Sequence, residues 1–376
     1  MMTVLRSTPV LRELGLRHLK NFFEGASIFQ HATGRGTLYH LTKILLHRGI
    51  KTVLLPTICP EGIIQPFSMA GFDIHFYHLE KDLSPCKESL ESTCFESSQK
   101  AILIAIDFFG LQNNTSYIEE ICKANQILLL RDFAQTLAPK EDIGSFTSLK
   151  PDFILFSFNK TLPVVDGAIL LSNNSDFPVD TQFSKRRRIN TIASESYLSH
   201  LELVQKFKDC ENIVEGQEIL LKTYETYETY YKEIQDPTIN YEPITQIDFS
   251  LNSSYIEAEI ALRRSNFSRL NTKWPLLSLR KLNDSETFGA APFAFPALVS
   301  GHERGEVSGL FLNNGILLSS FYEKWDHIPI FEREKFIVER SFLDRNVMLP
   351  IGSGVNEKGI NQMLKILEIS YGEQNS

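Results

Sequence analysis

The sequence predicts an α/β protein with a large three-layer α/β/α domain and a smaller C-terminal α+β domain. Between Lys51 and Ser172, short apolar runs alternate with amphipathic stretches, a pattern typical of strands and helices in a layered sheet. The chain has 376 residues, and single hydrophobic cores stop growing at about 250 to 300 residues. After Pro237 the pattern becomes irregular and includes a proline-rich segment. We therefore expect one domain at 1–236 and a second at 237–376.

Six short apolar runs in the first half are predicted to form the sheet. Most of them are bounded by Pro, Gly, Asp or Asn, residues that commonly end strands. The runs that start at Ala101 and Ile127 show no polar alternation, as expected of strands buried on both faces. The predicted strands span 52–55, 74–78, 101–108, 127–130, 153–158 and 168–172.

Helices are predicted where apolar residues recur at spacings of three and four. Four segments follow this pattern, at 37–48, 61–70, 117–124 and 356–369. A much longer helical stretch, 194–234, follows the last predicted strand. We interpret it as a spine between the two domains.

The acidic balance of the chain argues against nucleic acid as a partner. A formal net charge of -8 at pH 7 repels polyphosphate backbones, so binding would need a local basic patch. The basic run at 185–188 is the obvious one, and we interpret it as a solvated loop. The alternative is a patch that meets an anionic substrate.

Cysteine and histidine spacing predicts neither disulfides nor a metal site. The five cysteines are scattered and form no C-x-x-C pair, and the histidines have no metal-ligand spacing. The N-terminal segment contains no run near the ~18 apolar residues of a membrane span. We expect a cytoplasmic protein with reduced thiols and no membrane partner.

A glycine-flanked turn, T-G-R-G-T-L at 33–38, runs directly into a predicted helix. Gly34 and Gly36 allow backbone N–H groups to approach a ligand closely, and a helix N-terminus attracts anions such as phosphate. The alternative interpretation is an ordinary N-cap turn.

An aspartate follows the buried strand 127–130, in the segment R-D-F-A-Q at 131–135. The carboxyl ends of strands in an open α/β sheet face the ligand site. Asp132 can therefore pair with a protonated pyridine nitrogen of a cofactor. The alternative is a turn aspartate that caps the next helix.

The next strand ends in F-S-F-N-K at 156–160. A lysine at the end of a buried strand is expensive to bury as an ammonium, so it tends to become a neutral nucleophile. We interpret Lys160 as an imine-forming amine and Ser157 as a phosphate ligand. The alternatives are a surface lysine just past the strand and the S-x-x-K of serine acyl-transfer enzymes, where the serine opens a helix.

In this order, the three elements resemble the DegT/StrS-like family of fold-type I aminotransferases that depend on pyridoxal 5'-phosphate (PLP). The D-x-A-Q and serine-to-lysine motifs are the specific ones, and the resemblance spans most of the chain. Further segments that look like the family are L-P-T-I-C-P at 55–60, A-G-F-D-I-H-F-Y at 70–77, I-D-F-F-G at 106–110, F-P-A-L at 295–298, L-N-N-G-I at 312–316 and L-P-I at 349–351.

The resemblance implies PLP as the cofactor, with Lys160 forming the internal aldimine and acting as general acid and base. It implies that Asp132 binds the pyridine nitrogen and that Gln135 lies on the ring-hydroxyl side. The phosphate would be held by Ser157 and by the backbone of Gly34, Arg35 and Gly36.

The implied reaction moves an amino group from an amino acid, usually glutamate, to a nucleotide-linked keto sugar. Such reactions serve polysaccharide or secondary-metabolite biosynthesis, and the resemblance also implies a homodimer whose site is completed by the second subunit.

Two features depart from the family. Its sugar aminotransferases often separate the serine and the lysine by five positions, whereas Ser157 and Lys160 are three apart. The family also places an aromatic or His over the ring at a position near 58–60, where this chain has neither. A PLP-dependent sugar dehydratase, another non-transaminating PLP enzyme and a degenerate PLP-fold binding protein therefore remain alternatives.

Overall fold

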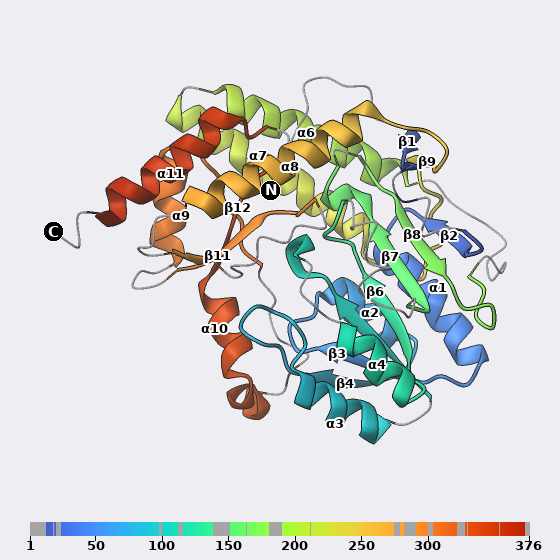
Figure 1. Cartoon of the computed structure of the whole chain (residues 1–376). Coiled ribbons are helices and arrows are strands. Elements are labelled where there is room, and N and C mark those ends of the chain that lie inside the picture. The colour runs from blue at the N-terminus through green and yellow to red at the C-terminus, as the bar shows by residue number, and fades with distance from the viewer. Residues whose placement is uncertain are drawn as a thin grey trace.

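Seven strands form the main sheet of the computed structural model (Figure 1). Their order is β2-β8-β7-β6-β5-β3-β4, in which β3 to β7 run parallel and β8 runs antiparallel to both of its neighbours. The strands are β2 (Ser27–His31), β3 (Thr52–Pro56), β4 (Asp73–Tyr77), β5 (Ala101–Ile106), β6 (Leu128–Asp132), β7 (Phe153–Ser157) and β8 (Ala168–Ser172). The structure describes residues 13–17, 19, 24–97, 100–111, 116–137, 151–162, 164–179, 190–210, 212–273, 279–281, 291–299, 304–321, 328, 330–352 and 354–372.

All six predicted strands are confirmed, with ends that differ by at most two residues. β5 and β7 are buried along their whole length, which explains why their sequences show no polar alternation. The edge strand β2 was not predicted, because four of its five residues are only partly buried and it includes polar side chains. It pairs with β8 and leads directly into the first helix.

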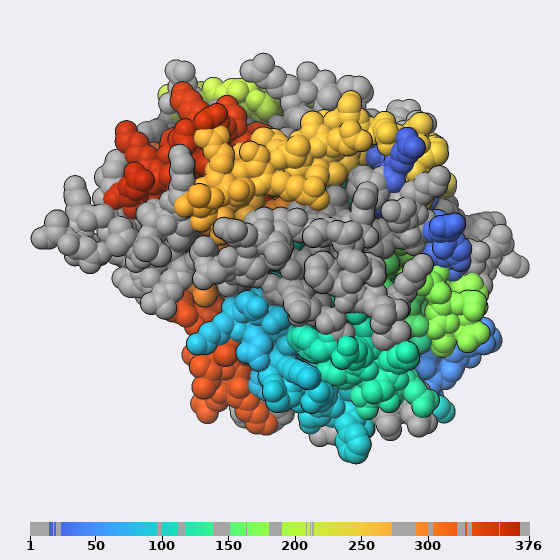
Figure 2. All heavy atoms as spheres, viewed as in Figure 1, coloured from blue at the N-terminus to red at the C-terminus, as the bar shows by residue number. Residues whose placement is uncertain are grey.

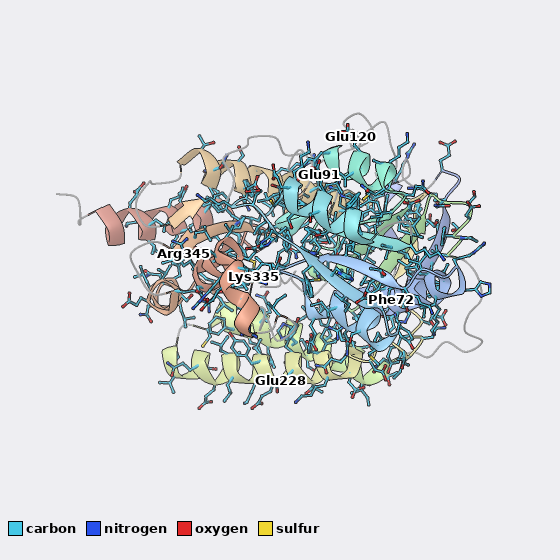
Figure 3. The ribbon with its side chains drawn as sticks, turned by 90° about the horizontal axis from the view of Figure 1, so that it is seen from below. Phe72, Glu91, Glu120, Glu228, Lys335 and Arg345 are labelled. Atoms are coloured by element: carbon cyan, nitrogen blue, oxygen red, sulfur yellow. The ribbon has the colours of Figure 1, made fainter. Side chains whose placement is uncertain are left out.

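Helices cover both faces of the sheet. Seen from below, Figure 3 shows α3 and α4, marked by Glu91 and Glu120, on one side, and α7, marked by Glu228, on the other. The helices α1, α2 and α4 confirm the predicted helices at 37–48, 61–70 and 117–124. The bounds are α1 (Gly34–His47), α2 (Glu61–Met69), α3 (Lys87–Ser97) and α4 (Ser116–Ala124).

The prediction of one long helix at 194–234 is wrong. Two helices, α6 (Thr191–Asp209) and α7 (Ile213–Ile234), pack side by side as an antiparallel hairpin. The break is caused by Asn212, whose side-chain oxygen caps α7 by accepting the N–H groups of Val214 and Glu215. The apolar periodicity continues through the turn and so conceals it.

The second half of the chain builds a smaller antiparallel sheet with order β10-β11-β12. Its helices lie beside it, and Figure 2 shows α8 along the surface, from the neighbourhood of β1 (Glu13–Gly15) towards α11. The predicted final helix is confirmed as α11. The elements are β10 (Leu279–Lys281), β11 (Phe295–Val299), β12 (Asn346–Leu349), α8 (Ser254–Lys273), α9 (Arg304–Asn313), η4 (Ile330–Lys335), α10 (Ile337–Arg345) and α11 (Glu357–Gly372).

The two sheets share one apolar core. Phe109, beyond the carboxyl end of β5, contacts Phe321 and Phe342 at ring-centroid distances of 5.8 and 6.1 Å. The N-terminal strand β1 (Glu13–Gly15) pairs in parallel with β9 (Gln246–Asp248). The division into domains at 1–236 and 237–376 therefore stays a proposal, since the shared core and the β1–β9 pair both cross it.

The cysteines, the helices and the basic run concern three further predictions from the sequence. All five cysteines are free, as their scattered spacing predicted. Among the described residues, none of the helices is both long and apolar enough to cross a membrane. The basic run at 185–188 lies outside the described residues.

Gly36, in the first turn of α1, is required by a close approach. A Cβ atom added at this position would lie 2.0 Å from Cε1 and 2.3 Å from Nδ1 of His31. The His31 ring is buried, and its Nδ1 accepts the N–H of Thr33 at 3.0 Å. The ring therefore cannot retreat without losing a buried hydrogen bond.

We expect Gly36→Ala to lower the free energy of unfolding by about 1–3 kcal/mol, because the new methyl group overpacks a filled space. The measurement is urea denaturation followed by circular dichroism. The matched control is Gly309→Ala in α9, where a Cβ would meet nothing within 4 Å, so it should be neutral or gain up to ~1 kcal/mol. Equal stability of Gly36→Ala and the unchanged protein would contradict the packing argument.

Candidate active site

The start of α1 and the ends of two strands meet at one edge of the main sheet. β6 ends at Asp132 and β7 ends at Ser157, and these parallel neighbours place their carboxyl ends at the same edge. A Cβ added to Gly34 would lie 3.8 Å from the Oγ of Ser157. The structure thus brings together Gly34 and Ser157, which are far apart in the sequence. We call this place the Gly34–Ser157 corner.

The first turn of α1 offers backbone donors at this corner. Thr33 caps the helix, and its Oγ1 accepts the N–H of Gly36 at 3.1 Å. The N–H groups of Gly34 and Arg35 belong to the same turn, for which a helix itself provides no acceptor. These donors and the positive end of the helix dipole make the corner suited to an anion. Gly36 contributes mainly by allowing the approach of His31.

The side chain of Arg35 is used for packing. Its Nη1 donates to Oε1 of Gln65 at 3.0 Å, and its Nη2 donates to the hydroxyl of Tyr231 at 3.0 Å. The guanidinium also lies 5.1 Å from the centre of the Tyr231 ring. These contacts hold the guanidinium in place, and the binding of a phosphate by the backbone of Arg35 stays a prediction.

Asp132 is a buried carboxylate at the end of β6. Its side chain is shielded from solvent, and Oδ1 accepts the N–H of Ala134 at 2.7 Å. Burial raises the pKa of Asp132, whereas the positive charge of Lys160 lowers it. Lys160 is therefore close enough to Asp132 to influence its ionisation.

Lys160 does not have the buried environment that we predicted. β7 ends at Ser157, and the chain then turns through a short 3-10 helix, η3 (Phe158–Lys160). Phe158 takes the buried position, and Lys160 is exposed in the single chain. The exposed ammonium keeps its hydration, which avoids the cost of burying a charge. The lysine thus occupies the position of our alternative interpretation, just past the strand.

Gln135 holds a neighbouring turn. Its Oε1 accepts the N–H of Phe109 at 2.8 Å, and Phe109 has a φ of 59°, in the left-handed region. Gly110 follows with a φ of 73°, and a Cβ there would lie 2.8 Å from the backbone oxygen of Gln135. One lone pair of its carbonyl oxygen is thus engaged, whereas its NH₂ group can still donate to a ligand.

A buried charged cluster behind Asp132 was missed by the sequence analysis. Arg131 lies between two acids, with Nη2 2.7 Å from Oδ1 of Asp107 and Nη1 3.7 Å from Oε1 of Glu119. Neither carboxylate oxygen of Glu119 has a hydrogen-bond partner among the described residues. Burial raises the pKa of Glu119 to about 7, against the opposing effect of Arg131. Charged residues at the ends of the adjacent apolar strands 101–108 and 127–130 were the available signal.

We expect Glu119→Gln to stabilise the protein at pH 8. The pKa of Glu119 lies above its ordinary value of 4.5, so its ionisation costs folding free energy progressively as pH rises from about 4.5 to 7. Removing the charge should therefore raise the free energy of unfolding by on the order of 2–3 kcal/mol at pH 8, and by little near pH 4.5.

Urea unfolding at several pH values measures this difference. Glu120→Gln, at the exposed neighbouring position, is the control and should change stability little at any pH. A Glu119→Gln protein that is less stable than the unchanged protein at pH 8 would show that the ion pair with Arg131 outweighs desolvation.

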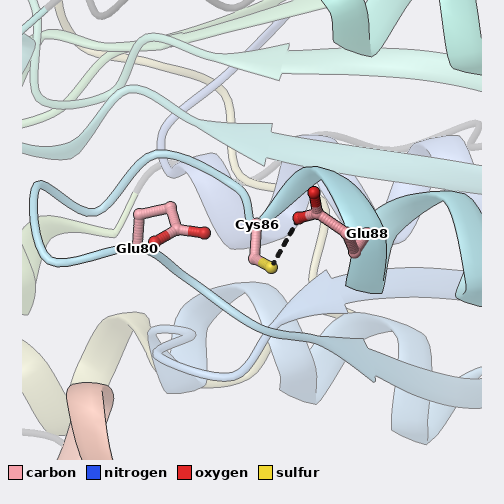
Figure 4. Close-up of side chains that lie close together, drawn as sticks. All are labelled: Glu80, Cys86 and Glu88. Atoms are coloured by element: carbon pink, nitrogen blue, oxygen red, sulfur yellow. Dashed lines mark hydrogen bonds between the residues drawn. The ribbon is translucent and has the colours of Figure 1, made fainter.

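A second cluster, formed by Glu80, Cys86 and Glu88, is not a convincing metal site. Its possible ligand atoms lie within 4.8 Å of one another, and the Sγ of Cys86 donates to Oε2 of Glu88 at 3.6 Å (Figure 4). Burial and the nearby acids raise the pKa of the Cys86 thiol, whereas metal binding requires a thiolate. Both glutamates are exposed.

No protein-family model and no curated protein sequence matches the chain. The chain is, however, similar to solved structures. A DegT DnrJ EryC1 StrS aminotransferase from Brucella abortus is similar with a TM-score of 0.62 and 15% identity, over 98% of this chain and 92% of that chain.

PseC from Helicobacter pylori, an aminotransferase involved in the biosynthesis of pseudoaminic acid, has a TM-score of 0.62 and 13% identity, over 98% and 94% of the two chains. NtdA from Bacillus subtilis with bound cofactor PMP has a TM-score of 0.59 and 11% identity, over 90% of this chain and 72% of that chain. At these identities the likeness establishes the fold, and it confirms the predicted fold-type I architecture.

Proposed function

We propose that the chain is a PLP-dependent aminotransferase that moves an amino group from an amino acid to a nucleotide-linked keto sugar. The observation that carries this proposal is the meeting of the Gly34–Ser157 corner, the buried Asp132 and Lys160 at one sheet edge. The similar solved structures support it, since one is an aminotransferase involved in the biosynthesis of pseudoaminic acid and another contains the cofactor PMP.

The residues present fit PLP in charge and in order. The N-terminal turn of α1 and the Ser157 hydroxyl would hold the phosphate, at a corner that offers donors. The carboxylate of Asp132 would pair with the pyridine nitrogen. When bound, PLP supplies an electrophilic carbonyl for amines and an electron sink for the adjoining carbon.

Asp132 and Lys160 have separate chemical roles in this proposal. Asp132 would keep a proton on the ring nitrogen, and its burial strengthens that attraction because the local dielectric is low. The Nζ of Lys160 would attack the cofactor carbonyl and, once displaced, move a proton at the substrate carbon.

We propose that the active form is a homodimer. Lys160 is exposed in the single chain, whereas a site that moves protons benefits from the exclusion of water. A second subunit that covers this edge of the sheet would supply that exclusion.

One observation favours a second candidate, a non-enzymatic binding protein built on a PLP-enzyme fold. The turn that carries Lys160 follows Ser157 directly and leaves the amine exposed to solvent. Such a protein would have no need of a reactive lysine, so the chemistry of Lys160 separates the two candidates.

We expect the protein incubated with PLP to absorb visible light and to lose this band on borohydride reduction, because Lys160 forms a reducible covalent bond with the cofactor. Peptide mass mapping should place the added mass on Lys160. Lys160→Ala should abolish the adduct, whereas Lys123→Ala, at an exposed lysine of α4, should retain it. An adduct on another lysine, or none at saturating PLP, would favour the binding protein.

We expect Asp132→Asn to retain PLP but to slow amino transfer from L-glutamate by at least about 100-fold, because a neutral amide cannot keep the ring nitrogen protonated. The measurement is the absorbance change after L-glutamate is mixed with the PLP-loaded protein. Asp176→Asn, at an exposed turn after β8, is the control. An unchanged rate in Asp132→Asn would assign the pairing to a different acid.

A further inference from the structure

Tyr230, near the end of α7, belongs to a chain of three hydrogen bonds that runs from Val165 to Ser157. The Tyr230 hydroxyl donates to the backbone oxygen of Val165 at 3.2 Å. The Nδ2 of Asn159 donates to the Tyr230 oxygen at 2.8 Å. The hydroxyl of Ser157 donates to Oδ1 of Asn159 at 3.0 Å. The chain thus ends at the Gly34–Ser157 corner, three residues before Lys160.

The direction of each hydrogen bond follows from its chemistry. The carbonyl of Val165 can only accept, so the Tyr230 hydroxyl donates its single hydrogen there. Burial raises the pKa of Tyr230, so this hydrogen is retained. The Tyr230 oxygen then accepts from the NH₂ of Asn159, which leaves the amide oxygen to face Ser157. The only hydroxyl hydrogen of Ser157 is therefore committed to Asn159.

This polarity opposes the binding of a phosphate. Phosphate oxygens are acceptors, and the Ser157 oxygen presents lone pairs to the corner while its hydrogen points to Asn159. A phosphate must draw that hydrogen away and leave the amide oxygen of Asn159 without its donor. Leaving a partly buried acceptor unmatched carries a free-energy cost.

The packing around Tyr230 holds this arrangement in place. Its ring is almost fully buried and lies 4.8 Å from the ring of Tyr197, centre to centre, within the α6–α7 hairpin. The next residue, Tyr231, accepts a hydrogen bond from Arg35 in the first turn of α1. The hairpin is thus anchored to both sides of the corner.

We propose that Tyr230 is a positioning residue which, through Asn159, turns the Ser157 hydroxyl away from the corner and weakens the binding of a phosphate there. The inference rests on the proposed function, in which that phosphate belongs to PLP. Without the Tyr230 hydroxyl, the Asn159 amide can turn its NH₂ group towards Ser157. The serine oxygen then accepts, and its hydrogen becomes available to the phosphate.

The test is a double-mutant cycle of PLP affinity with Tyr230→Phe and Ser157→Ala, measured by absorbance titration. Tyr230→Phe should lower the Kd for PLP by about 3- to 10-fold, the equivalent of one neutral hydrogen bond. It should have no effect in the Ser157→Ala background, nor on pyridoxal, which lacks the phosphate. Tyr224→Phe, at an exposed tyrosine of the same helix, should leave the Kd unchanged.

Asn159→Ala provides an independent variant, because it removes the acceptor and should also tighten PLP binding. Its thermal melt, with that of Tyr230→Phe, checks that the variants fold. Weaker or unchanged PLP binding in both variants, or an equal effect of Tyr230→Phe with and without Ser157, would overturn the inference.

Failure of the proposed function has a different signature, in which the unchanged protein binds no PLP at all. In that case, the shift of the thermal melt by inorganic phosphate tests the corner directly. A larger shift for Tyr230→Phe than for the unchanged protein would support the inference, and an equal or smaller shift would overturn it.

Discussion

The close approach of α1 to the ends of β2 and β7 is the constraint on which the site depends. Gly36 lies against the His31 ring, where a side chain has no room, and Gly34 lies beside Ser157, where a Cβ would make an ordinary contact. This close approach aims the positive end of a helix at the carboxyl edge of the sheet. Without it, the edge would hold carboxylates and a lysine but no place for an anion.

The two sides of this sheet edge attract ligand groups of opposite charge. Asp107, Glu119 and Asp132 are all buried on one side, with Arg131 as the buried cation among them, so this side favours positive groups. The start of α1 favours a negative one. A ligand with a phosphate at one end and a protonatable ring at the other matches this division better than a purely anionic or purely cationic molecule.

Sequence patterns predicted the structural features that depend on local burial. They failed for the features that depend on contacts between distant parts of the chain. The strand at Ala168–Ser172 was predicted with the right ends, because five consecutive buried residues leave a continuous apolar run. The conformation of Lys160 depends on a 3-10 turn, and the partner of Gln135 is a backbone N–H on another strand's exit. Neither feature can be predicted from the local periodicity of the sequence. The chain from Tyr230 to Ser157 joins residues more than seventy positions apart, so no motif could reveal it.

The pairing of β1 with β9 affects how the protein folds while it is being synthesised. The two strands are about 230 residues apart, so β1 has no partner until those further residues have been synthesised. Contacts of such long range close slowly, because a large loop must lose entropy first. The nascent chain therefore carries an unpaired strand edge for much of its synthesis, and such edges are templates for aggregation. During that interval the demand for chaperones should be greatest, well before the active site exists.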